Sequence, residues 1–288
     1  MNSPVLFSFM LVYNSKNWDK LLSFNRTFIT KNKQAITYYH ILPQFKRGDC
    51  INFVFQTTSE KVDALAKNIN ESYSTFLEKH KSDSLENIND SNPFLLNYPN
   101  NSILFFKNPG FYHTNVNLAG SFRIINNKIC KLFEQISNYY IDNVIETPEY
   151  SRSWFKNFDA LKFSLLLVKR SQIKLPSEVF NRFYKFKSSE NLNEETLKIL
   201  NQKYKEIENE LIEFINNIEN EQKEINIIES YFLDTNSYLE EKKTNEIIFL
   251  IHQIFTLFGL SDQDVIYICY FTESALLKLN NGYDEIGY

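Results

Sequence analysis

Strand-forming and helix-forming patterns occupy different parts of this 288-residue sequence, and that separation limits the folds open to it. Segments rich in aromatic and β-branched residues, typical of strands, lie at 4–13, 35–42, 50–56 and 103–106. From about residue 117 onward, apolar residues recur mainly at helical spacing. This order predicts an α+β fold, with an antiparallel or mixed sheet in the N-terminal third packed with helices and a helical C-terminal half.

Helices are expected between the early strands and throughout the later sequence. The first helix spans 16–31 with Ser15 as its cap, and the second spans 59–79. The later helices are predicted at 117–142, 148–169, 193–221, 223–239, 244–258 and 261–279. The helix at 193–221 carries one apolar stripe, which suits a helix packed on its own domain better than a coiled-coil arm. Residues 80–101, rich in Asn, Ser, Asp and Pro, are expected to form a surface loop.

The length suits one large domain or two small ones, and the composition is ordinary for a soluble protein. We expect a single domain spanning 1–288, β-rich over 1–115 and helical over 116–288. The net charge of −4 argues against a nucleic-acid partner, although a local basic patch remains open. That patch would consist of Lys162, Lys169, Arg170, Arg182, Lys185 and Lys187. No membrane span or signal peptide is expected, and the three cysteines are interpreted as buried apolar residues in a reducing cytoplasm.

Standard catalytic motifs are absent from the sequence, and no cofactor or metal is expected. There is no GxGxxG, P-loop, GxSxG or HExxH, and the four histidines do not pair at metal-ligand spacing. Three local features remain as candidates: Tyr38-Tyr39-His40 on a strand, His252 on an apolar helix, and Phe111-Tyr112-His113 after a Pro-Gly turn. On a strand, Tyr38 and His40 share one face and Tyr39 takes the other. The competing interpretations are sheet packing for the first feature, a hydrogen-bonded core histidine for the second, and a partly exposed aromatic turn for the third.

Both ends of the chain resemble one family, the C-terminal domain of lantibiotic dehydratases, which also occurs as separate thiopeptide-type bacteriocin biosynthesis proteins. That family has an apolar strand and a helix, then strands of the type W-F-F-I-R-Y and H-L-R-L-R-F. Here the corresponding text is AITYYHIL, then PQFKRGD, then CINFVF. Near its end the family has a helix of the type L-x-H-M-x-x-N-R-L-x-G, and residues 249–260 are FLIHQIFTLFGL.

The departures from the family pattern concern its arginines. Those of the second strand fall on Asn52 and Val54, that of the preceding strand falls near Ile41, and the Asn-Arg after the histidine is Phe255-Thr256. Dehydratases of this family eliminate glutamate from a glutamylated Ser or Thr, which requires cations for the glutamyl carboxylate and for developing negative charge. The resemblance therefore makes efficient glutamate elimination doubtful for this chain.

The same fold is used by cyclases that form the pyridine of thiopeptides from two dehydroalanines and a peptide amide in a formal [4+2] cycloaddition, with loss of water and the leader peptide. This reaction handles no glutamate, and its needs are peptide positioning, burial of apolar groups and proton transfer. The resemblance thus implies a cytoplasmic enzyme acting on a leader-bearing precursor peptide, together with other enzymes of its pathway. The catalytic candidates are His252, Tyr270, Ser274, His40 and Tyr38, and the substrate-binding candidates are Asn52, Arg26, Arg152, Tyr112 and His113.

Two alternatives stay open. In the first alternative, the chain would be an elimination subunit that works beside a separate glutamylating protein. Cations such as Arg26, Arg123 or Arg152 would then replace the arginines of the family pattern. Alternatively, it is a non-catalytic subunit that binds the leader.

Overall fold

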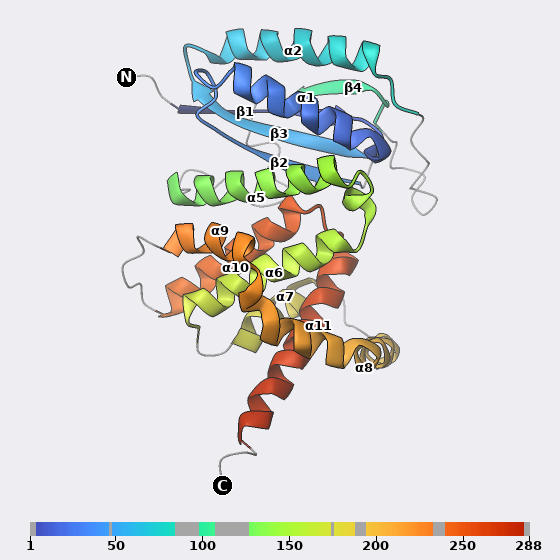
Figure 1. Cartoon of the computed structure of the whole chain (residues 1–288), viewed down its shortest axis with the longest axis vertical. Coiled ribbons are helices and arrows are strands. Elements are labelled where there is room, and N and C mark those ends of the chain that lie inside the picture. The colour runs from blue at the N-terminus through green and yellow to red at the C-terminus, as the bar shows by residue number, and fades with distance from the viewer. Residues whose placement is uncertain are drawn as a thin grey trace. The chain divides into compact units, whose positions relative to one another are not determined.

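The α+β prediction is confirmed by the computed structural model (Figure 1), which describes residues 4–45, 48–83, 98–106, 127–173, 176–187, 194–232 and 240–284. Within these residues the strands are β1 (Pro4–Val12), β2 (Tyr38–Gln44), β3 (Cys50–Thr58) and β4 (Ser102–Phe106). They form one antiparallel sheet in the order β2-β3-β1-β4. All four lie at or near the predicted positions.

Helix α1 (Trp18–Lys31) connects β1 to β2, and α2 (Val62–Lys79) connects β3 to β4. The resulting order β-α-β-β-α-β, with β3 between the parallel strands β1 and β2, is the ferredoxin-like arrangement. Both helices pack on the same face of the sheet: Phe28 of α1 stacks on Phe55, and Tyr73 of α2 contacts Phe9 and Phe53. The other face of the sheet is therefore not covered by α1 or α2.

Aromatic rings fill the space between the sheet and these two helices. Phe9 and Phe53, paired in register on neighbouring strands, stack with centroids 5.1 Å apart. The buried Tyr73 hydroxyl donates to Asn25 Oδ1 of α1 at 2.6 Å, which satisfies the hydroxyl inside an apolar layer. The high phenylalanine and tyrosine content of the sequence is in part a consequence of this ring-filled core.

The predicted capping of the first helix by Ser15 is wrong. Ser15 begins a short 3₁₀ turn, Ser15–Asn17, and the Asn14 side chain caps that turn by accepting from the Lys16 amide. The Ser15 amide instead donates to Asp49 Oδ2 at 2.7 Å. The carboxylate of Asp49, in the turn before β3, accepts a hydrogen bond at the start of this helical segment. Because Asp49 is 34 residues away in sequence, a local capping pattern could not predict this contact.

Asp49 follows Gly48, whose φ of +102° is readily adopted only by glycine. The Asp49 side chain is 1% exposed and also accepts from Arg152 Nη2 at 2.6 Å. Its backbone carbonyl accepts from the Tyr13 amide at 3.0 Å. The turn thereby holds the end of β1, the start of α1 and the Arg152 segment together, while Arg47 lies outside the described residues.

The remaining described helices are α5 (Asn127–Glu146), α6 (Phe155–Ser171), α7 (Pro176–Lys187), α8 (Glu194–Asn217), α9 (Gln222–Phe232), α10 (Glu240–Leu257) and α11 (Asp262–Asp284), with 3₁₀ turns at Tyr150–Arg152 and Ile218–Asn220. Helix α7 is only 12 residues long and is absent from the predicted helices, although Val179, Phe180 and Phe183 recur at helical spacing and are buried. Pro176 at its first position was an available signal. The predicted helical stretches 117–126 and 233–239 lie outside the described residues.

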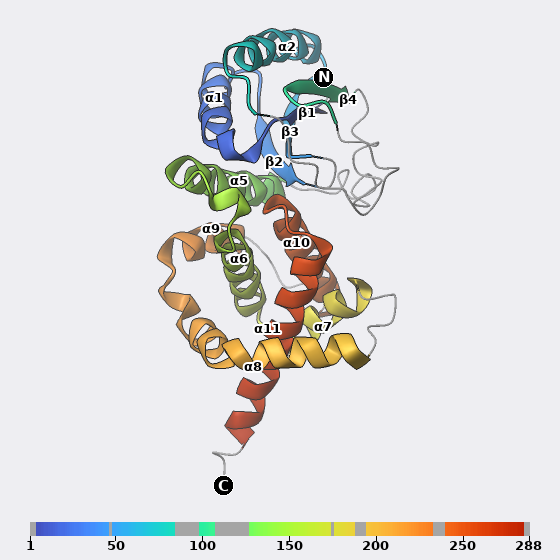
Figure 2. The ribbon, with the colours of Figure 1, turned by 90° about the vertical axis from the view of Figure 1, so that its right-hand side faces the viewer.

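The chain divides into two compact units, which are described separately. The sheet unit comprises residues 1–156 and 257–259, and the helical unit comprises 157–256 and 260–288. In the helical unit, α8 packs on α11 through Tyr204 and Phe271, so the long charged helix packs on its own unit as predicted (Figure 2). No helix within the described residues is long and apolar enough to cross a bilayer.

Gly259 belongs to the sheet unit and has a positive φ of +63°. A Cβ added there would lie 3.0 Å from both Cβ and the carbonyl oxygen of Pro43. Nearby, Phe258 contacts the rings of Tyr139 and Tyr140 on α5. Backbone conformation and close packing against β2 therefore both require glycine at this position.

We expect Asp49→Asn to lower the free energy of unfolding by about 2 kcal/mol, because it weakens a buried carboxylate that holds an amide and a guanidinium. The matched control is Asp142→Asn, which weakens a largely solvent-accessible ion pair with Arg26 and should cost less than about 1 kcal/mol. Urea denaturation followed by circular dichroism measures both. Equal losses in the two variants would contradict the anchoring role of Asp49.

Candidate functional site

Polar side chains gather on the sheet face that points away from α1 and α2. Strand pairing aligns Ser8, Val54 and His40 in one cross-strand row, and Met10, Asn52 and Leu42 in the next. Directly opposed residues share a face, so Ser8, His40, Asn52 and Tyr38 all lie on this side. Tyr39 points to the other side, as predicted. We call Ser8, Tyr38, His40 and Asn52 the polar face.

Tyr38 and His40 form a buried hydrogen-bonded pair. The Tyr38 hydroxyl lies 2.6 Å from His40 Nδ1, and the two residues are 4% and 2% exposed. Burial raises the pKa of Tyr38 well above its ordinary value, and Cys130 and Glu134 raise it further. Tyr38 therefore remains a neutral hydrogen-bonding group at physiological pH.

Asn52 and Ser8 complete the polar face from β3 and β1. Asn52 is 0% exposed and Ser8 is 2% exposed. The Ser8 hydroxyl has no hydrogen-bond partner among the described residues, which is unusual for a buried polar atom. Sequence reasoning missed Ser8, although its place in the alternation Leu6, Ser8, Met10, Val12 could have drawn attention to it.

Helix α5 packs along the edge strand β2. Ser137 Oγ accepts from the Ile41 amide at 3.2 Å, Asn138 accepts from the Tyr39 hydroxyl, and Phe133 contacts the His40 ring. These residues and Glu134 recur at helical spacing on one side of α5. Burial raises the pKa of the Glu134 carboxyl. The helix thus satisfies the exposed edge of β2 and encloses the Tyr38–His40 pair from one side.

The two arginines predicted to bind substrate are engaged within the sheet unit. Arg26 pairs with Asp142 of α5, and Arg152 pairs with the buried Asp49 and donates to the Ser15 hydroxyl. The partners are 116 and 103 residues away in sequence. Their positive charges are thus partly neutralised, which weakens the interpretation of either residue as a carboxylate receptor.

The proposed basic patch is largely neutralised as well. In the helical unit, Lys162 lies within 4 Å of Asp159, Glu221 and Glu224, while Lys169 and Arg170 share Glu219. Arg182 pairs with Glu178 one turn away. The side chains of Lys185 and Lys187 are outside the described part. The four described cations therefore do not form an unopposed basic patch.

His252 lies on α10 of the helical unit and is partly exposed. Its ring stacks on Phe183 of α7, with the two planes 16° apart, and its Nδ1 is 3.5 Å from Gln253 Nε2. A partly exposed imidazole against an aromatic ring retains the capacity for proton transfer.

Tyr270 and Ser274 share a face of α11, as their spacing predicts, but each already has a structural partner. The Tyr270 hydroxyl donates to Asn201 Oδ1 of α8 at 2.6 Å, and the Ser274 hydroxyl donates to the Tyr270 carbonyl. Burial raises the pKa of Tyr270. His252 contacts Phe183 of α7, whereas Tyr270 contacts Asn201 of α8.

Tyr112, His113 and Arg123 lie outside the described residues, so their roles stay predictions. No group of three or more His, Cys, Asp or Glu residues that could hold a metal occurs in the described ranges. Two of the cysteines, Cys50 and Cys269, are buried as predicted, whereas Cys130 is only half-buried.

No family model matches the chain, and no curated protein matches it. Among solved structures, the chain is similar to a pyridine synthase. That enzyme is TbtD, from thiomuracin biosynthesis; the comparison has a TM-score of 0.61 and 12% sequence identity, and covers 96% of this chain and 99% of that chain. At this identity the likeness establishes a shared fold.

Stability should fall as pH rises above 10, because several buried tyrosines hold their protons more tightly when folded. Burial raises the pKa of Tyr39 to about 12, and Glu134 contributes to the rise. Between pH 10 and 12 the folded chain keeps a proton that the unfolded chain loses, which lowers the unfolding free energy by up to about 1.4 kcal/mol per pH unit for each such group. Urea denaturation between pH 9 and 11.5 should show a shallower decline for Tyr39→Phe than for the wild type. An identical slope in that variant would contradict the assignment.

Proposed function

We propose that this chain matures a ribosomally made peptide by forming the pyridine of a thiopeptide macrocycle. The reaction is the formal [4+2] cyclisation of two dehydroalanines, with loss of water and release of the leader peptide. The observation that carries the proposal is the correspondence in fold with a pyridine synthase over nearly the full length of both chains. Correspondence of that extent involves the helical unit as well as the sheet unit, rather than a common substructure alone.

The polar face supports cyclisation over glutamate elimination. Asn52 and Val54 stand where the family resemblance places arginines, and the neighbouring groups Ser8, Tyr38 and His40 carry no fixed positive charge. Elimination requires cations for the glutamyl carboxylate, whereas Arg26 and Arg152 are already paired with aspartates. Cyclisation of uncharged dehydroalanines needs no such cation, and positioning alone can supply up to about 7–11 kcal/mol of barrier reduction.

We assign proton transfer to His252 in the first place. Its ring is partly exposed, so a peptide substrate could approach it, and imidazole is the side chain most often used for general acid–base catalysis. Tyr38 and His40 come second, because both are buried and bonded to each other. Tyr270 and Ser274 rank below them, since their hydroxyls are occupied within the helical unit.

The direct test supplies a precursor that already carries azoles and two dehydroalanines, and follows the products by mass spectrometry. The proposal expects a macrocycle that has lost water, together with free leader peptide. A parallel sample receives glutamylated precursor, and loss of glutamate there would instead identify an elimination subunit. Leader affinity without a mass change in any precursor form would identify a non-catalytic binding subunit.

We expect His252→Ala to reduce the rate of cyclisation by about 100-fold, the typical loss on removing one acid–base group. His80→Ala is the matched control, because His80 is an exposed residue at the end of α2 in the sheet unit. Single-turnover kinetics separate the chemical step from substrate binding. Unchanged turnover in His252→Ala would remove the leading catalytic assignment while leaving the reaction class intact.

A further inference from the structure

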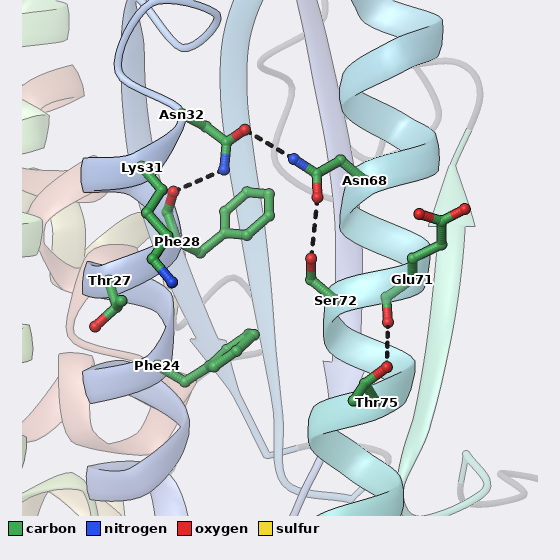
Figure 3. Close-up of a pocket in the computed structure, with 9 residues that line it drawn as sticks. All are labelled: Phe24, Thr27, Phe28, Lys31, Asn32, Asn68, Glu71, Ser72 and Thr75. Carbon is green, nitrogen blue, oxygen red and sulfur yellow. Dashed lines mark hydrogen bonds between the residues drawn. The ribbon is translucent and has the colours of Figure 1, made fainter.

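A groove with a volume of about 590 Å³ runs between α1 and α2 on the helix-covered side of the sheet (Figure 3). Its lining residues, all in the sheet unit, are Phe24, Thr27, Phe28, Lys31, Asn32, Asn68, Glu71, Ser72 and Thr75. None of these residues belongs to the polar face. The groove is therefore a second site, built from side chains that the proposed chemistry does not use.

The lining residues form a floor and two rims. Phe24, Phe28 and Asn32 recur every four residues along α1, and Asn68 and Ser72 do the same along α2, so each set forms a row parallel to its helix. These floor residues are buried or partly buried, whereas the rim residues Thr27, Lys31, Glu71 and Thr75 are exposed. At about 1.5 Å per residue, the α1 row is about 12 Å long, which matches about four residues of extended peptide.

Apolar and polar groups occupy different parts of this floor. Figure 3 shows the rings of Phe24 and Phe28 turned toward the space between the helices. Next to them, Asn68 Nδ2 donates to Asn32 Oδ1 at 2.8 Å, and Ser72 Oγ donates to Asn68 Oδ1 at 3.0 Å. Each of these amides has a second N–H and further acceptor capacity. An extended peptide can use such groups with its own backbone, whereas the backbone of a helical ligand is already satisfied.

The two charged rim residues, Lys31 and Glu71, differ in whether they already have an ion-pair partner. Glu71 lies 3.9 Å from Lys67 on the same helix. Lys31 has no ion pair within the described part of the chain, and in Figure 3 its amine extends over the α1 side of the groove. A cation without an ion pair on the α1 rim favours a ligand that places a carboxylate on that side of the apolar floor, away from Glu71 on the α2 rim.

We propose that this groove binds an extended, acidic and apolar segment of about four residues, with the apolar side chains on Phe24 and Phe28 and the carboxylate at Lys31. Resting on the proposed function, the segment belongs to the leader of the precursor peptide, since the dehydroalanines that cyclise carry no carboxylate for Lys31 to bind. Gripping the leader here holds the substrate by a part that undergoes no chemistry.

The first experiment uses the full chain labelled with ¹⁵N and two synthetic peptides, acetyl-Leu-Asp-Leu-Leu-amide and acetyl-Leu-Lys-Leu-Leu-amide. The acidic peptide should bind about threefold more tightly than the basic one, as expected for an exposed ion pair, and shift the amide signals of Phe28, Asn32 and Asn68. Lys31→Glu should reverse the order of the two affinities. The matched control Lys33→Glu changes the same charge at an exposed position outside the lining and should preserve the wild-type order.

The second experiment fills the groove. Thr75→Trp places a large ring at an exposed rim position and should abolish the shifts caused by the acidic peptide, whereas Thr30→Trp adds the same ring on α1 outside the lining and should retain them. Shifts that persist in Thr75→Trp, or equal affinities of wild type for both peptides, would overturn the groove proposal.

Cyclisation of the precursor is measured separately. Peptide binding without cyclisation refutes the proposed function alone, and cyclisation without peptide binding refutes the groove proposal alone.

Discussion

The sheet unit depends on one buried carboxylate. Asp49 receives the Ser15 amide and the Arg152 guanidinium, while its backbone carbonyl receives the Tyr13 amide. These bonds join the turn before β3 to the end of β1, the start of α1 and the segment after α5. Because a buried charge is stable only when it is paired and hydrogen-bonded, the Ser15 and Arg152 contacts together stabilise the carboxylate in its buried position. The same bonds engage Arg152, one of the arginines expected from the sequence to bind substrate, in an ion pair within the sheet unit.

The side-chain alternation of the strands determines which chemistry this unit can support. One face presents Phe9, Phe53 and Phe55 to the helices, and the other presents Ser8, Tyr38, His40 and Asn52. A shift of one residue in the pairing of any strand would exchange the two sets, so the aromatic core fixes the position of the polar groups. None of these four polar side chains is an arginine or a lysine, so they offer no fixed positive charge to a carboxylate or to developing negative charge. This limitation connects the missing arginines to the class of reaction proposed.

The parts of the fold that could be predicted from the sequence are those determined by residues close together in the sequence. The two-residue period of β2 placed Tyr38 and His40 on one face, and the helical stripe of α8 indicated packing on its own unit. What could not be predicted depends on distant partners. The sequence around Ser15 does not indicate its contact with Asp49, and the sequence around Arg26 does not indicate its ion pair with Asp142, which is 116 residues away. The groove between α1 and α2 was missed for the same reason, because its floor combines two amphipathic helices whose separation is set by the sheet beneath them.

If the groove between α1 and α2 binds the leader and other residues carry out the cyclisation, binding energy and chemistry come from different parts of the protein. Dehydroalanines offer little charge or hydrogen-bonding contrast, so the binding energy that positions them has to come from another part of the substrate. A leader supplies it, but the leader is also a product of the reaction, and a leader that bound tightly would block the next turnover. An exposed cation such as Lys31 suits this demand, because surface ion pairs contribute only about 0.2–1 kcal/mol and weaken with salt. Modest affinity in the groove is therefore compatible with release of the leader after each turnover, and increasing ionic strength should weaken leader binding.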